Sequence, residues 1–321
     1  MRLIALLTLL ATPALADFPE TVRDHILPGY VAFATAADGL AASAAKDCSA
    51  AAVRPAFNAA FDAWLGVEHV RFGPVEENGI GLAIAFWPDP KGSGAKSQRA
   101  LLLGDPALLQ PAAFAQQSVA ARGLTGLERL IYPKADLPGD PCALIRATAN
   151  DLAVTAHKID DAWTGGFAQT VLTAGEPGNT TYLTRTEARQ VMFTQVIAGL
   201  EFLLDQRLAR PLGTSGAPRP ERAESVASGR SMTNIRLSLR ALRAMVETLT
   251  PDVPQTMAGF DLAIARAEAL DDPVLAGVAV PKVRTRIEDL QKAVLAVRNT
   301  AIAELGPELD VGVGFNAADG D

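Results

Sequence analysis

Apolar residues recur at spacings of three and four along several long alanine- and leucine-rich segments of this chain. Because side chains three and four apart share one face of an α-helix, the pattern predicts amphipathic helices. Only residues 80–87 have the character of a β-strand. The chain is therefore expected to be all-α, with its helices gathered into two bundle-like halves. The expected helices cover residues 19–46, 50–71, 140–163, 184–210, 221–249 and 282–304.

Two irregular stretches, residues 72–94 and residues 165–181, are rich in glycine and interrupt the helical segments. Loops longer than about 15 residues are uncommon inside compact domains, so the second stretch is expected to join two domains. A short echo between Gly126-Leu127-Glu128 and Gly199-Leu200-Glu201 fits an internal duplication and fits chance equally well. The expected organisation is a signal peptide at 1–16, an N-terminal helical bundle at 17–165, a linker at 166–181 and a C-terminal helical bundle at 182–321.

The N-terminus has the three parts of an export signal. Arg2 is followed by an apolar run and then by Ala14-Leu15-Ala16, a small-x-small cleavage site. Its removal takes the formal charge from −7 to −8, because Arg2 is the one charged residue lost. We expect a periplasmic protein that neither binds nucleic acid nor inserts into a membrane, since it is acidic and its remaining segments are too short or too polar to span one.

Cys48 and Cys142 are the only cysteines. An even number of cysteines in an oxidising compartment predicts a disulfide between them, although the sequence leaves open whether the bond forms. Two cysteines are too few for a thiolate metal site.

The chain lacks the motifs of the common hydrolases and nucleotide-binding proteins. It has no His-Glu-x-x-His zinc motif, no Gly-x-Ser-x-Gly elbow, no Walker loop and no dinucleotide-binding glycine pattern. With three histidines in all, it offers little for a histidine-rich metal centre. Catalytic residues are therefore not predicted, and enzymatic activity is not expected.

Two glutamates have surroundings that point to burial. Glu68 lies beside the apolar side of an expected helix, three residues before Arg71, and Glu128 lies beside an apolar stripe. A buried carboxylate needs an arginine, a metal or hydrogen-bond donors, so each glutamate is either a ligand or half of a structural ion pair. The pairs would be Glu68 with Arg71, and Glu128 with Arg122 or Arg129.

The histidines give weaker indications. His69 is expected to be partly exposed on its helix, and His25 to hydrogen-bond at a local bend. His157 and Asp160 share one helical face, which is more typical of a solvated surface than of a metal site.

Several motifs together resemble the imelysin family, and they extend over nearly the whole chain in the family's order. They are residues 25–30 (HILPGY), 64–74 (WLGVEHVRFGP), 86–90 (FWPDP), 121–128 (ARGLTGLE), 211–213 (PLG), 228–234 (SGRSMTN) and 314–321 (GFNAADGD).

The resemblance implies an exported all-helical protein of two bundle-like halves, linked to iron acquisition. The family carries a peptidase name, and its hallmark is Gly-x-His-x-x-Glu, a presumed metal motif. Here the glycine falls on Gly123 and the glutamate on Glu128, but the histidine falls on Thr125. A second acidic position of the family falls on Glu68. Carboxylates and a hydroxyl suit a hard cation such as Fe(III), Ca²⁺ or Mg²⁺ better than Zn²⁺.

The preferred hypothesis is a periplasmic binding protein for iron or metal-linked uptake. Its ligand, a small molecule or metal chelate, would lie in a cleft between the bundles, and an envelope transport protein would be its partner. Alternatives are an envelope protein that binds a partner and no metal, and a metallopeptidase. The expected metal ligands are Glu68 and Glu128, and the other expected ligand-binding residues are Thr125, Arg71, Arg122, Trp87 and Asp89.

Overall fold

The computed structural model describes residues 17–312, so the expected signal peptide at 1–16 and the motif at 314–321 lie outside the described residues. The all-α prediction is confirmed: the described residues form helices and no strand, apart from one isolated bridge between Thr214 and Ala217. The expected strand at residues 80–87 is wrong, because Ile80–Ile84 is helical and only the residues after it are extended. Within 17–312, no helix combines the length and apolarity needed to cross a membrane.

The helices follow one another with few long interruptions. The first nine are α1 (Phe18–Thr21), α2 (Leu27–Lys46), α3 (Ala50–Leu65), α4 (Ile80–Ile84), α5 (Ser93–Leu103), α6 (Pro111–Phe114), α7 (Gly123–Ile131), α8 (Cys142–Ala162) and α9 (Ala168–Leu172). The others are α10 (Arg185–Phe202), α11 (Arg210–Leu212), α12 (Ser231–Leu249), α13 (Pro254–Glu268), α14 (Pro281–Thr300) and α15 (Gly306–Glu308). Wider π-helical turns join some of them without a break, at Val22–Ile26, Trp163–Phe167, Leu203–Ala209 and Ala301–Leu305. Short 3₁₀ turns occur at Gly73–Val75, Glu77–Gly79, Pro106–Leu109, Val119–Ala121, Pro220–Arg222 and Ala276–Ala279.

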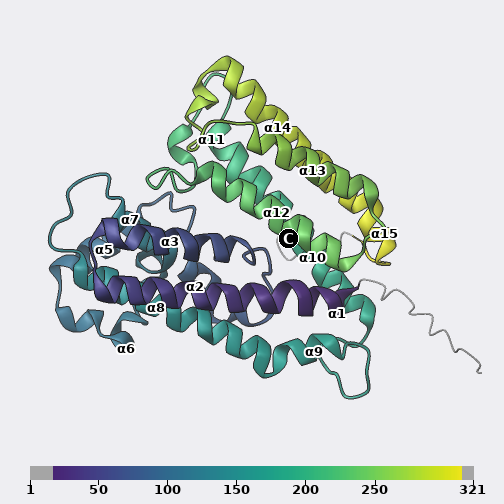
Figure 1. Ribbon diagram of the computed structural model, residues 1–321, viewed down its shortest axis with the longest axis horizontal. Coiled ribbons are helices and arrows are strands. Elements are labelled where there is room, and N and C mark those ends of the chain that lie inside the picture. Colours follow the sequence, from purple (N-terminus) through teal and green to yellow (C-terminus); the bar gives the residue numbers. More distant parts are fainter. Residues whose placement is uncertain (1–16, 313–321) are drawn as a thin grey trace, which may run out of the picture.

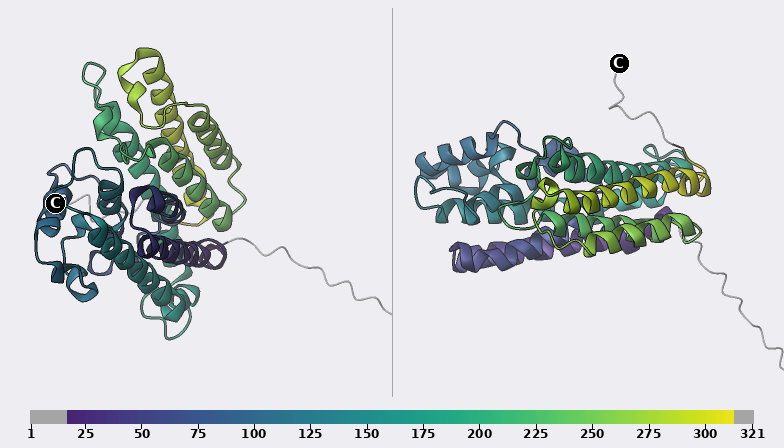
Figure 2. Two further views of the ribbon diagram at one scale, coloured as in Figure 1. Left: turned by 60° about the vertical axis from the view of Figure 1, so that its left-hand side comes forward. Right: turned by 90° about the horizontal axis from the view of Figure 1, so that it is seen from above.

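Two groups of long helices lie side by side. Helix α2 packs between α3 and α8, while α13 packs on both α12 and α14 (Figure 1). Seen from above, the long helices of both groups run along the long axis of the molecule (Figure 2). Helix α12 also contacts α1 and α3, so it belongs to both groups. One continuous apolar core extends through the two groups.

A disulfide ties the first group together. It joins Cys48, in the turn between α2 and α3, to Cys142 at the start of α8, with Cα atoms 5.3 Å apart. The bond holds the ends of the three helices α2, α3 and α8 together.

Two helix boundaries that matter for the site differ from the prediction. Helix α3 ends at Leu65 instead of residue 71, and α12 begins at Ser231 instead of residue 221. Helix α13 was not predicted. The first part of the expected linker is helix α9, and irregular backbone begins only after it. The division into bundles at 17–165 and 182–321 stays a prediction.

Candidate functional site

A buried polar cluster lies where the two helix groups meet. Its centre is Arg207, in the π turn between α10 and α11, which is 2% exposed. The Arg207 side chain bonds Glu68, Glu224 and Ser238, and Asn234 in turn bonds Glu224. We call these five residues, all of them buried, the junction network.

Arg207 holds two carboxylates at once. Its Nη1 and Nη2 donate to the two carboxylate oxygens of Glu68, the second at 3.0 Å. Its Nε and Nη2 donate to Glu224 at 2.8 and 3.2 Å. Burial alone would lower the pKa of Arg207, but its attraction to Glu224 and Glu68 outweighs that cost and raises the pKa above its ordinary value. The guanidinium is therefore a permanent internal cation.

Neutral donors complete the junction network. The hydroxyl of Ser238 donates to Glu68 at 2.9 Å, and the amide of Asn234 donates to Glu224 at 2.7 Å. Both donors lie on the buried face of α12. The network thus connects the loop after α3 to α12 and to the turn after α10, and it has one positive charge for two negative ones.

Glu128, on α7, is held differently. The Ser225 hydroxyl donates to Oε2 at 3.2 Å, while the backbone N–H and hydroxyl of Ser228 donate to Oε1 at 3.1 and 2.6 Å. Within residues 17–312, no arginine or lysine forms an ion pair with this 8% exposed carboxylate. Burial raises its pKa, the serine hydrogen bonds oppose the rise, and the charge of Glu224 adds to it. We call Glu128, Ser225 and Ser228 the Glu128 site.

Local backbone geometry builds the Glu128 site. Ser225 has a positive φ of 51°, an unusual conformation for a side chain-bearing residue that often occurs at functional sites. Gly123, with a φ of 64°, opens α7, where a Cβ would lie 2.2 Å from the carbonyl oxygens of Ala83 and Ile84. Because any side chain at this position would clash with the backbone of α4, only glycine allows α7 to approach α4 this closely.

Thr125 is buried and has backbone partners. Its hydroxyl accepts from the Phe86 N–H at 3.1 Å and donates to the Phe86 carbonyl at 3.3 Å. The residue at the histidine position of the family motif therefore anchors the segment that leads to Trp87. The Trp87 ring packs edge-on against Phe202, with centroids 6.1 Å apart.

The expected pairs of Glu68 with Arg71 and of Glu128 with Arg122 are not formed, and the ligand-binding role of the two arginines stays a prediction. Arg122 makes a two-pronged ion pair with Asp151 on α8, each bond 2.8 Å long. Arg71 donates from Nε to the Glu68 backbone carbonyl, not to its carboxylate. Glu68 and Arg71 were expected to pair across one turn of a helix, but α3 ends at Leu65, before both of them.

Asp89 and the three histidines form hydrogen bonds or close contacts with residues other than the two glutamates. Asp89 accepts from the backbone N–H groups of Ser93 and Gly94 at the start of α5, both at 2.8 Å. His69, expected to be partly exposed, is buried, and its Nε2 lies 2.9 Å from Nε2 of His25. His157 bonds Asp38 at an exposed site and makes no pair with Asp160.

The donor set does not complete a transition-metal site made of protein side chains alone. No three His, Cys, Asp or Glu side chains gather for a metal ion in the part of the chain that the structure describes. Both Glu68 oxygens receive bonds from Arg207, and the Thr125 hydroxyl is committed to Phe86. The Glu128 site offers oxygen atoms only.

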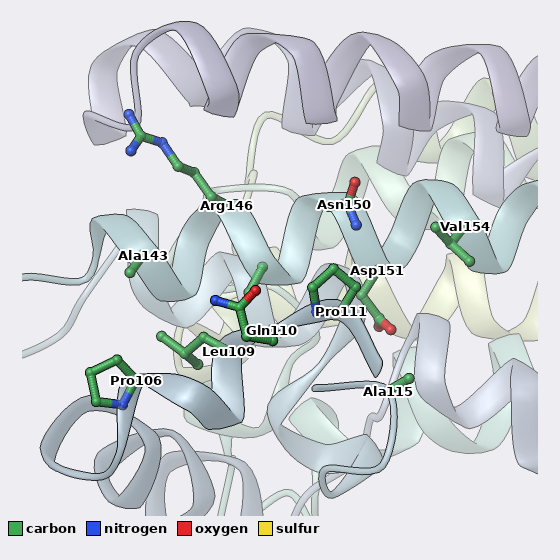
Figure 3. A pocket seen from close by; sticks show the side chains of 11 residues that line it. Pro106, Leu109, Gln110, Pro111, Ala115, Ala143, Arg146, Asn150, Asp151 and Val154 are labelled. Atoms are coloured by element: carbon green, nitrogen blue, oxygen red, sulfur yellow. The ribbon is translucent and has the colours of Figure 1, made fainter. Parts of the chain in front are cut away.

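A cavity of about 460 Å³ lies away from these glutamates, between α8 and the segment around α6 (Figure 3). Leu109, Pro111 and Val154 give it an apolar lining, and Asp151, the partner of Arg122, lies at its edge. Neither Glu68 nor Glu128 lines it. The expected cleft between the bundles stays a prediction.

Sequence reasoning missed most of the partners of the two glutamates. Arg207 sits among leucines in a helical pattern and lies 139 positions from Glu68, so no local signal marks it. Glu224, Ser225 and Ser228 were assigned to the start of a helix that begins later, at Ser231. Among the sequence motifs, only the one at residues 228–234 contained any of these partners, namely Ser228 and Asn234.

Comparisons with known proteins agree on one family. A sequence model of the family described as Imelysin matches residues 26–301. Iron-regulated protein A from Synechococcus elongatus is 21% identical over 314 residues, covering 89% of this chain and 84% of that protein.

Two solved structures are similar in fold. An imelysin-like protein from Psychrobacter arcticum has a TM-score of 0.79 at 20% identity, covering 93% of this chain and 96% of its own. A putative iron-regulated protein A precursor from Parabacteroides distasonis has a TM-score of 0.66 at 14% identity, covering 89% and 94%.

Proposed function

Because the chain belongs to the imelysin family, we propose that it is an exported binding protein of an iron-linked process, with a metal cation as its cargo. Two relatives bear names that call them iron-regulated, and one is called a precursor. The signal-peptide pattern at 1–16 supports export to the periplasm. The cation would bind at the Glu128 site, beside the junction network.

The unpaired charge of Glu128 carries this proposal. A buried carboxylate is costly unless an opposite charge or several hydrogen bonds compensate it. Glu128 has three hydrogen bonds from neutral donors, and no cation pairs with it among the described residues. The charge of Glu224 raises its pKa further. A bound cation would offset both the free-energy cost of burying the Glu128 charge and its repulsion from Glu224.

Glu68 has a supporting role in this proposal. Both of its carboxylate oxygens receive hydrogen bonds from Arg207, so it would lose that pairing if it bound a metal. We therefore propose that Glu68 fixes the wall of the site through Arg207, while Glu128 meets the cation.

The chemistry of the donors restricts the cargo. Glu128, Ser225 and Ser228 supply carboxylate and hydroxyl oxygens, which hard cations such as Fe(III) prefer over soft ones. Since the protein supplies so few donors, water or a chelate must complete the coordination shell. The cation is then transferable cargo and not a permanent cofactor.

Equilibrium dialysis tests the proposal. Metal-free protein is dialysed against ferric citrate, ferrous iron without oxygen, and Mn²⁺, and bound metal is measured. The E128Q variant keeps the shape of the side chain and removes its charge, so it should bind at least about tenfold more weakly. Glu77, an exposed residue, provides the matched control E77Q. Equal binding by E128Q and the unchanged protein would contradict the proposal.

A second candidate, a partner-binding envelope protein without metal, is favoured by the pairing of Glu68 with Arg207. It predicts that E128Q changes stability only and that no metal is retained in dialysis. The metallopeptidase alternative has no specific observation in its favour, since no three-residue metal-ligand group is present in residues 17–312. Chelator-sensitive cleavage of an unfolded protein substrate would revive it.

A further inference from the structure

Two arginines beside the junction network carry charges that no acidic side chain compensates. Among the described residues, neither Arg71, in the loop after α3, nor Arg210, at the start of α11, forms an ion pair. The Nε atom of Arg210 is buried and has no hydrogen-bond partner. Two neighbouring arginines do form ion pairs: Arg207 holds Glu68 and Glu224, and Arg230 pairs with Asp62, although Arg230 Nε also has no partner among the described residues.

Both guanidinium groups lie over aromatic rings that contact each other. The Cζ atom of Arg71 is 5.3 Å from the ring centre of Phe202, and that of Arg210 is 5.8 Å from the ring of Trp87. The two rings meet at an interplanar angle of 78°. An aromatic face holds a guanidinium in place while leaving its N–H groups free for a planar anion. We call these four residues the arginine platform.

The arginine platform is joined to the rest of the site by contacts on both sides. The Cζ atom of Arg207 lies 5.0 Å from the ring of Phe202, so this ring connects the platform to the junction network. On the other side, the Thr125 hydroxyl binds both backbone polar groups of Phe86, the residue before Trp87. Thr125 is thus a positioning residue for the platform.

We propose that the arginine platform is an anion subsite that binds the carboxylate groups of the chelate in which the metal arrives. Planar carboxylates match the two parallel N–H donors of arginine, and such charge-assisted pairs are among the stronger hydrogen bonds in proteins. An anionic ligand would explain why an acidic protein carries two arginines without ion-pair partners close to each other. This inference rests on the proposed function for the metal and adds the class of ligand, a small polycarboxylate.

Calorimetric titration with citrate, with and without bound ferric iron, tests the inference on the full mature chain. R71Q and R210Q should each weaken citrate binding by about tenfold or more, which corresponds to the loss of one charge-assisted hydrogen-bonded pair. Arg99 on α5 is exposed and forms no ion pair in the described chain, so R99Q removes an equal charge and should change binding less than twofold. Thermal unfolding of each variant shows that it is folded.

The outcomes separate this inference from the proposed function. If R71Q and R210Q lose citrate binding while E128Q retains iron, the platform is right and the metal site at Glu128 is wrong. If E128Q loses iron while the arginine variants bind ferric citrate normally, the platform is only a packing arrangement and the inference is overturned. The absence of any citrate binding by the unchanged protein would also overturn it, as would equal losses in R99Q.

Discussion

Arg207 is the residue on which the arrangement of the site depends most. Its guanidinium donates to two buried carboxylates and lies over Phe202, so one side chain connects the junction network to the arginine platform. Glu68 and Glu224 come from loops that do not otherwise share hydrogen-bonded structure. Without the cation between them, two buried negative charges would face each other.

Replacement of Arg207 by glutamine should be strongly destabilising. Removing one partner from a buried ion pair costs about 3–5 kcal/mol, because the remaining charge is left without compensation. Urea unfolding at pH 7 measures the loss.

The contrast with Ser238 provides a control. S238A removes one neutral donor to Glu68 and should cost about 1 kcal/mol. If R207Q lowers the free energy of unfolding by no more than S238A does, the junction network contributes little to the stability of the fold.

The sequence predicts most of helix α12 correctly but does not reveal α13, the helix that packs against its arginine side. Ile235, Leu239, Leu242 and Met245, spaced as on one helical face, are all buried. Arg236, Arg240 and Arg243 form a second stripe, which spacing alone would place in solvent. Arg236 donates to the carbonyl oxygens of Ala267 and Leu270 at 3.0 and 2.7 Å, at the C-terminal end of α13. Arg240 pairs with Glu268 on the same helix. The stripe therefore faces the helix that the sequence did not reveal.

The two arginines on this face should differ in their contribution to stability. R236A leaves carbonyl groups at the end of α13 without their donor and should cost about 1–2 kcal/mol. R240A breaks an exposed ion pair and should cost less than about 0.5 kcal/mol. Chemical denaturation of both variants checks the order, and a larger loss in R240A would contradict it.

The sequence predicted helices well and their ends less well, for a physical reason. The expected starts at residues 184 and 282 agree with α10 and α14: the Thr184 hydroxyl accepts from the Glu187 N–H to cap α10, and Pro281 begins α14. The end of α3 depends on distant partners. The Val70 carbonyl accepts from Tyr30, and the Arg71 N–H donates to Gln195. Local periodicity cannot register such contacts, so it extended the helix through Glu68.

The same limit applies to the site. Thr125, Glu128 and Glu68 were identified because the family motif falls on them, but their roles depend on residues far away in the chain. Ser228, the partner of Glu128, is 100 positions from it, and Arg207 is 139 positions from Glu68. Arg122 was assigned by its nearness in sequence to Glu128, and it pairs with Asp151 instead.

At the scale of the whole molecule, ion pairs and a disulfide join segments that are far apart in sequence. Asp17 accepts from Arg185 and Arg189 on α10, and Asp62 on α3 pairs with Arg230 before α12. The Glu68–Arg207 pair connects the same two helix groups. The contact between the groups is thus polar at several places, and the site lies within it.

Acid should weaken the whole fold through the pair formed by the partly buried His25 and the buried His69. Burial lowers the pKa of His25 to about 4, and burial with the nearby charges of His25 and Arg71 lowers that of His69 well below 6.5. Since the unfolded chain has histidine pKa values near 6.5, it binds more protons than the folded chain between pH 6.5 and 4. This stability is present above pH 6.5 and is lost as the pH falls towards 4.

The H25Q variant measures that effect. The unchanged protein should lose about 2 kcal/mol between pH 7 and pH 5 through His25, and H25Q should lose correspondingly less. His157 acts in the opposite direction, because its hydrogen bond to Asp38 raises its pKa, so H157Q is measured alongside. If the stability of H25Q and of the unchanged protein depends on pH in the same way, the pKa of His25 is not lowered in the folded protein.

A crystal of the mature protein soaked with ferric citrate, with diffraction measured on both sides of the iron absorption edge, tests the central claim most directly. We expect an anomalous peak within bonding distance of the Glu128 carboxylate, with Arg207 still holding Glu68. A peak bonded to Glu68 in place of Arg207, or no iron at Glu128 in a crystal soaked at saturating concentration, would contradict it.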